Sequence, residues 1–114
     1  MNTISTKKLF ELYLDTLDCC KLSLLSEADD IIEYELFEEF DIGVHSFLHH
    51  KNLEKLLKEN YIDEEIKNLS IELREMYLLI DEDKHGADDV RNDKDWHAIL
   101  KLSDLIKNKI SKLE

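Results

Sequence analysis

The sequence contains no proline and only two glycines, Gly43 and Gly86, among its 114 residues. These two residue types supply most tight turns, and a sheet protein needs many turns. Their scarcity, together with the abundance of leucine, glutamate and lysine, argues against a β-rich fold. It predicts long helices with few, short connections, and therefore an all-α fold, an antiparallel bundle of four to five helices.

Cysteine is equally scarce, and the two cysteines, Cys19 and Cys20, are neighbours in the chain. A disulfide between adjacent residues is strained and rare, which excludes a secreted scaffold held by disulfides. The pair also lacks the CxxC spacing that is typical of zinc and redox sites. We therefore expect Cys20 to be a small core residue.

Long apolar runs are absent as well. No run approaches the ~18 residues of a membrane-spanning helix, so we expect no membrane placement. Residues 1–8 show no apolar segment typical of a secretory signal. Hydrophobic residues nonetheless make up 43% of the chain, enough for one core. The sequence predicts a single helical domain over residues 1–114.

Basic residues are few, with 15 Lys and Arg against 27 Asp and Glu and a net charge of −12. Binding to a phosphate backbone needs clustered lysine and arginine, so this balance disfavours a bare nucleic-acid binder. An acidic surface instead attracts cationic macromolecules and speeds their association. We expect a basic protein as the partner.

Apolar residues recur at steps of three and four in five segments, which predicts five helices. The clearest signal is a bundle seam at Ile62, Ile66, Leu69, Leu73, Met76 and Ile80. This seam could also support a homodimer, so monomer and homodimer both stay open. The expected helices cover about residues 5–21, 27–40, 47–59, 63–80 and 93–113, with N-caps at Ser26, Ser46, Asp63 and Asp93.

Two expected connections complete this scheme. Residues 41–44 interrupt the apolar pattern and predict a break between the second and third helices. Residues 81–92 are polar and acidic around Gly86, and we expect a loop there. Trp96, at the start of the last expected helix, should anchor that helix on the core.

The acids are concentrated in two segments. Residues 27–41 contain eight acids and no base, and residues 81–95 contain seven acids against three bases. Like charges four apart on a helix repel each other, so keeping eight without a counter-ion costs stability. One interpretation is a solvated surface that keeps the protein in solution, and the other is a docking surface for a cationic partner.

Three large aromatic residues, Tyr34, Phe37 and Phe40, lie within the first acidic segment. A single buried face of the helix cannot hold all three aromatic side chains together with Ile31, Ile32 and Leu36. Either this helix is central, or Tyr34 and Phe37 form an exposed anchor pair. The predicted partner-binding residues are Glu33, Tyr34, Glu35, Phe37, Glu38, Glu39, Asp41, Asp81, Asp83 and Asp88.

Catalytic and metal-binding patterns are weak. His45 and His49 have the i,i+4 spacing of a helical zinc site, but no HExxH motif or nearby cysteine accompanies them and His50. The carboxylates are too many to select an acid–base pair, and two distant glycines exclude a phosphate-binding loop. We expect no enzyme activity, no cofactor and no bound metal.

Four stretches together resemble a known group of proteins: residues 37–48 (FEEFDIGVHSFL), 56–66 (LLKENYIDEEI), 73–77 (LREMY) and 96–104 (WHAILKLSD). Over residues 33–110 the chain is similar to small acidic all-α immunity proteins of bacterial contact-dependent inhibition and polymorphic toxin systems. The resemblance implies a cytoplasmic inhibitor that binds one toxin domain, often a nuclease, and it carries over no active-site residue.

Two other functions stay open at this point. An acidic adaptor that mimics DNA and blocks a host nucleic-acid-binding protein would have the same charge. A metal-binding helical protein would use the histidines and carboxylates. The sequence favours the toxin inhibitor, with its carboxylates covering the basic surface of the toxin domain.

Overall fold

A computed structural model of the chain describes residues 4–113, and it confirms the all-α fold, because the described residues contain helices and no strand. The described α-helices are α1 (Thr6–Asp18), α2 (Asp29–Glu33), α3 (Asp41–His45), α4 (His50–Lys58), α5 (Glu64–Leu78), α6 (Ala87–Asn92) and α7 (Lys94–Leu113). A π-helix, η2 (Tyr34–Phe40), joins α2 to α3, and two 3₁₀ turns are η1 (Leu22–Ser26) and η3 (Glu82–Lys84).

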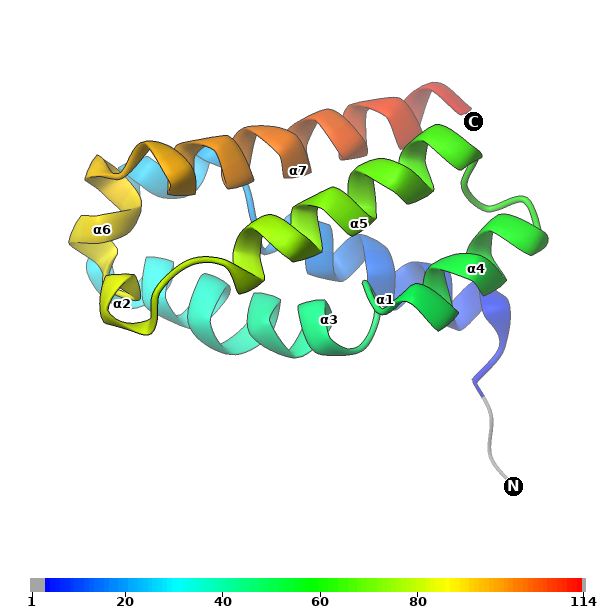
Figure 1. Ribbon diagram of the computed structural model, residues 1–114, viewed down its shortest axis with the longest axis horizontal. Coiled ribbons are helices and arrows are strands. Elements are labelled where there is room, and N and C mark those ends of the chain that lie inside the picture. The colour runs from blue at the N-terminus through cyan, green and yellow to red at the C-terminus, as the bar shows by residue number, and fades with distance from the viewer. Residues whose placement is uncertain (1–3, 114) are drawn as a thin grey trace.

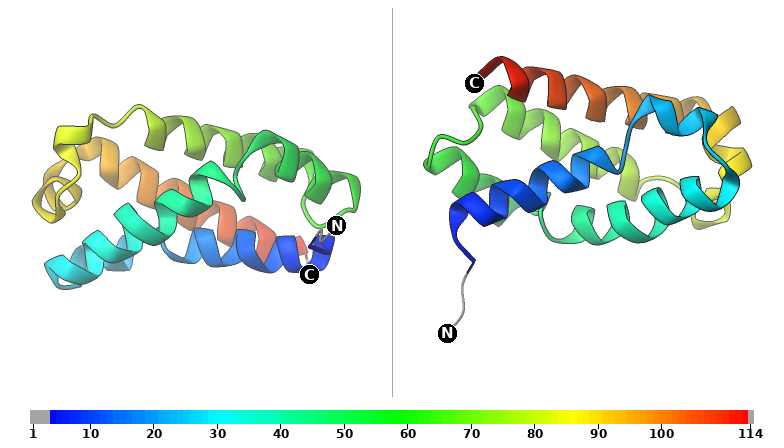
Figure 2. Two further views of the ribbon diagram at one scale, coloured as in Figure 1. Left: turned by 90° about the horizontal axis from the view of Figure 1, so that it is seen from below. Right: turned by 180° about the vertical axis from the view of Figure 1, so that it is seen from behind.

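The helices pack side by side with α5 and α7 running antiparallel (Figure 1). Helix α1 lies behind them, and the α2–η2–α3 segment runs along one side of the bundle (Figure 2). Helix α6 closes one end of the molecule against α2, while α4 packs on α1 and α5 at the other end. None of the described helices is long and apolar enough to cross a membrane.

The core follows the predicted seam. Ile62, Ile66 and Leu73 are buried, and the other three seam residues pack against the core while staying partly exposed at the α5–α7 edge. Trp96 is fully buried, as expected for the anchor of the last helix, and its indole N–H donates to the carbonyl of Lys84 at 3.0 Å. Cys20 is also fully buried, which confirms it as a core residue.

Several predicted boundaries are correct because their caps are local. The backbone N–H of Ile66 donates to the Asp63 carboxylate at 2.8 Å at the start of α5. The Asp93 carboxylate accepts from the Asp95 N–H at 2.7 Å directly before α7 begins. Each of these side chains satisfies a backbone donor that the first helical turn leaves free.

The predicted break at residues 41–44 is wrong, because the helix continues through α3 to His45. Gly43 lies inside this helix, where glycine usually costs about 1 kcal/mol. A larger residue would not fit here, because a Cβ at Gly43 would clash with Cγ2 of Thr16 in α1. Glycine therefore allows two helices to approach closely here rather than marking a turn.

Three further local predictions are wrong. Ser26 is the last residue of η1, and Ala28 is the N-cap of α2. Ser46 ends α3, while the His49 ring accepts the Lys51 N–H at 3.2 Å and caps α4. The expected 81–92 loop contains η3 and α6. Helix α6 is not predictable from the apolar pattern, because its six residues include only two buried apolar side chains. A helical repeat needs a longer segment to be recognised.

Candidate functional site

The acidic segment is one continuous helix, α2–η2–α3, with an unusual repeat. Ile32, Leu36, Phe40 and Val44 are each 0% exposed, so the buried row recurs every four residues. An α-helix has 3.6 residues per turn, so residues four apart drift around its axis. The wider i→i+5 turns of the π-helical middle offset that drift, so residues four apart stay on one side and the segment can be described as four rows of side chains.

The outer row faces solvent along the whole segment. It consists of Asp30, Tyr34, Glu38 and Ile42, all exposed, with Tyr34 at 50% and Ile42 at 60%. Acidic and apolar side chains thus alternate on the outermost face. This is the arrangement of a polar rim around apolar anchors that protein interfaces use.

One flanking row faces α1. Glu35 lies near the Cys19 thiol and helps to raise its pKa, and Glu39 lines a small pocket of about 140 Å³ with Thr16 and Cys19. The hydroxyl of Tyr34 donates to Glu39 at 2.8 Å across five residues, and this bond raises the pKa of Tyr34. The bond ties the outer row to this flanking row, so the Tyr34 ring is held in place.

The other flanking row faces α5, η3 and α6. The Glu33 carboxylate accepts the Ala87 N–H at 3.4 Å, and the Tyr77 hydroxyl donates to Asp41 at 2.8 Å. Phe37 stacks on His85 with ring centroids 5.0 Å apart and meets Trp96 edge-on at 5.6 Å. Phe37 is thus partly covered, so Tyr34 and Phe37 do not form an exposed pair.

Few of the acids are neutralised within the molecule. Among the described residues, Arg91 pairs with Asp29 at 2.5 Å, and His45 lies 3.6 Å from Asp41 as an ion pair when protonated. The other six acids of residues 27–41 have no cationic partner within 4 Å in the described part of the chain: Glu27, Asp30, Glu33, Glu35, Glu38 and Glu39.

The second acidic segment adds charge at the α6 end of this surface (Figure 1). Asp81 and Asp83 are exposed. Asp88 lies 3.6 Å from Arg91, the same guanidinium that reaches Asp29. The structure therefore joins the two acidic segments through α2 and α6, although the predicted residues occupy three rows rather than one face.

The histidines have structural roles or solvent contacts. His49 caps α4, and His50 lies 3.4 Å from Glu54 on the surface. No group of three or more His, Cys, Asp or Glu side chains in the described residues is arranged to hold a metal ion.

Two residues important for this surface were missed at the sequence level. The sequence pattern places Ile42 in a break, yet Ile42 extends the outer row. In the sequence Arg91 is one of three bases in an acidic segment, yet in the structure it links α6 to α2. The four-residue spacing of apolar residues from Ile32 to Val44 was the sequence signal that the helix continues through Ile42. The contact of Arg91 with Asp29 joins distant segments, and no local sequence pattern indicates such a contact.

No family model, curated protein or solved structure matches this chain.

Proposed function

We propose that the protein is an immunity protein, which binds a cognate toxin domain and neutralises it by covering a basic surface. A nuclease domain is the favoured kind of target, since it presents lysine and arginine to grip phosphates. The carboxylates of α2–η2–α3 would occupy that surface in place of nucleic acid. The inhibitor acts by occlusion and needs no catalytic group.

One observation carries this proposal. The α2–η2–α3 segment keeps five acids without an internal cation among the described residues, beside three exposed apolar side chains, Ile31, Tyr34 and Ile42. Repulsion between these acids costs stability in the free protein. A cationic partner would remove that repulsion on binding. Tyr34 and Ile42 would then supply the desolvated centre of the interface.

The proposal is tested with a variant of the outer row that combines Glu38→Lys and Tyr34→Ala. The partner to be purified for this test is the product of the open reading frame adjacent to that of this protein. Light scattering on a size-exclusion column should detect a one-to-one complex with the wild type and none with the variant. Growth protection against the toxin should be lost in parallel, while the helical circular dichroism spectrum is retained.

The charge change itself needs a matched control. The triple variant Glu33→Lys, Glu35→Lys and Glu38→Lys should also abolish protection. Glu11, Glu64 and Glu72 are exposed acids on α1 and α5, and reversing these three to lysine changes the net charge equally. Protection should survive in this control. Equal loss in both triple variants, or full protection by the outer-row variant, would contradict the assignment of the surface.

A further inference from the structure

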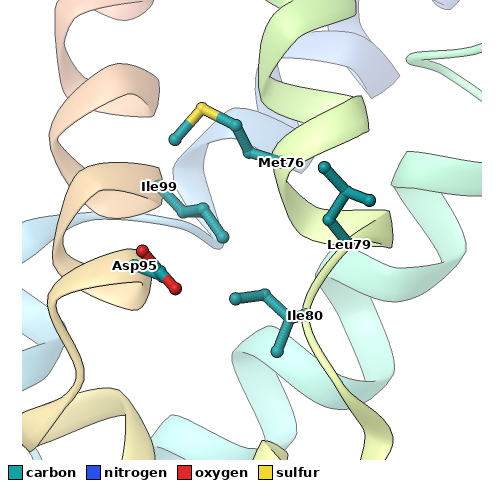
Figure 3. A pocket seen from close by; sticks show the side chains of 5 residues that line it. All are labelled: Met76, Leu79, Ile80, Asp95 and Ile99. Carbon is teal, nitrogen blue, oxygen red and sulfur yellow. The ribbon is translucent and has the colours of Figure 1, made fainter.

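A second surface feature is separate from the acidic helix. A shallow groove of about 200 Å³ lies between the end of α5 and the start of α7, lined by Met76, Leu79, Ile80, Asp95 and Ile99 (Figure 3). Ile99 is fully buried and forms its floor, while Leu79 is 82% exposed at its edge. A leucine this exposed stabilises the free fold little, so the fold alone does not account for it.

One charged group lines this apolar groove. Asp95 is exposed, and its carboxylate is turned toward the gap between α7 and Ile80 (Figure 3). Acids are favoured in the first turn of a helix, which accounts for the residue type at this position. Among the described residues no cation lies within 4 Å of this carboxylate. The nearby Lys84 pairs instead with Asp93 at 3.4 Å.

The surroundings of the groove are acidic. Glu75 is exposed four residues before Leu79, so the two are neighbours on the helix surface. The exposed acids of residues 81–83 follow Ile80 directly, and Lys94 is the exposed base next to Asp95 in sequence. A second copy of this chain, at net charge −12, would bring like charges together here.

We propose that this groove binds a basic amphipathic segment of a protein partner. An apolar side chain of the segment packs between Leu79, Ile80 and Ile99. An arginine or lysine of the same segment extends its aliphatic part along Met76 and pairs with Asp95. This groove contains none of the outer-row residues. Peptide binding in the groove can therefore be tested independently of partner binding by the α2–η2–α3 segment.

The test uses a synthetic helical peptide with leucine and arginine four residues apart, titrated into the ¹⁵N-labelled protein. Amide signals of Met76, Leu79, Ile80, Asp95 and Ile99 should shift. Matched peptides with serine for leucine, or glutamate for arginine, should lose these shifts. Shifts confined to residues 30–42, or equal shifts with the serine peptide, would overturn the proposal, because they would reflect general attraction to the acidic surface.

Two variants and their controls complete the test. Leu79→Ser and Asp95→Asn should each weaken peptide binding about five- to tenfold, as removal of an interface anchor does. Leu105→Ser on the exposed side of α7 and Glu64→Gln in the first turn of α5 make the same chemical changes elsewhere and should leave binding unchanged.

Two outcomes with these proteins would decide against the groove. Equal weakening by Asp95→Asn and Glu64→Gln would mean that net charge alone drives binding. Self-association that Leu79→Ser removes would assign the groove to a second copy of the chain. The outer-row variant should retain peptide binding, so failure of this site and failure of the proposed function are distinguishable.

Discussion

At the residue scale, the contact between Gly43 and Thr16 has the strictest geometry. The three atoms nearest to a Cβ at Gly43 are Cγ2, Oγ1 and Cβ of Thr16, and all three would be closer than real Cβ contacts allow. We predict that Gly43→Ala lowers the free energy of unfolding by ~1–3 kcal/mol, because added volume in a packed contact forces atoms apart. Urea denaturation measures the change.

The other glycine provides the control for this prediction. A Cβ at Gly86 would meet only Oδ2 of Asp89, at 3.1 Å and at the far end of a flexible side chain. Gly86→Ala should therefore change stability far less. Adding Thr16→Ala to Gly43→Ala should recover part of the loss, since it removes Cγ2 and Oγ1. Strictly additive effects in this pair would contradict the steric explanation.

Cys19 is the second residue with a testable environment. Burial, followed by the nearby carboxylate of Glu35 and the charge of Glu39, raises the pKa of Cys19 to about 12. The thiolate is the reactive form, so at pH 8 Cys19 should react with iodoacetamide far more slowly than an ordinary thiol. Mass spectrometry of the alkylated protein measures the rate.

Glu35→Gln should raise the alkylation rate of Cys19, because it removes a negative charge beside the thiol. Glu72→Gln, an exposed acid on α5, should leave the rate unchanged. Rapid alkylation of the wild type would mean that Cys19 is not shielded as described. The buried Cys20 should react only when the protein unfolds.

At the element scale, Arg91 holds α6 against the start of α2. Its guanidinium donates to the Glu27 carbonyl at 2.8 Å and pairs with Asp29 at 2.5 Å, and it is 29% exposed. A charge-assisted hydrogen bond that is shielded from solvent contributes ~1.5–3 kcal/mol to folding stability. Solvent weakens such a bond, so we expect about 1 kcal/mol from this partly exposed pair.

We therefore predict that Arg91→Ala speeds hydrogen exchange at the amides of α6 and α2 by about fivefold. Amides of α5 and α4, far from this contact, should change little. Lys8→Ala removes a pair with Glu11 that is exposed and 3.9 Å long, and it should have no measurable effect. Uniform acceleration throughout the molecule in Arg91→Ala would show a global loss rather than a local one.

The elements also show what sequence reasoning could and could not find. Helix α5 was predictable because its cap, Asp63, and its three–four spacing are both local signals. The α2–η2–α3 segment was divided too early because a 3.6-residue period was assumed where the buried row recurs every four residues. For the candidate surface, the sequence predicted eight acids without a counter-ion in residues 27–41, whereas Asp29 pairs with Arg91 and Asp41 lies beside His45. It also placed Phe37 beside Tyr34, although Phe37 packs on His85 and Trp96.

At the scale of the whole molecule, alkaline pH should unfold the protein readily. Burial is the main reason that the pKa values of Tyr13, Tyr77, Cys19 and Cys20 are raised in the folded state. The neutral form of each group is thus favoured by folding, and its contribution is complete below the ordinary pKa values of 9.0 for cysteine and 10.0 for tyrosine.

Above those values the unfolded chain releases protons more readily, so stability falls as pH rises. Each group contributes a slope of about 1.4 kcal/mol per pH unit between its unfolded and folded pKa values. Urea midpoints measured from pH 8 to pH 11 should therefore decline with increasing steepness. Tyr13→Phe should flatten the decline, and a midpoint independent of pH over this range would contradict the prediction.

The four-row geometry of α2–η2–α3 has a consequence for any attempt to copy this surface. A synthetic peptide of residues 29–45 taken out of the protein would lose the contacts with α1, α5 and α6 that hold its wider turns. The isolated peptide would form an ordinary α-helix with about 3.6 residues per turn. Asp30 and Ile42 would then point to different sides of that helix. Transfer of this surface to another scaffold therefore requires a backbone with the same π-helical turn, because the same side chains on an ordinary α-helix would point to different sides.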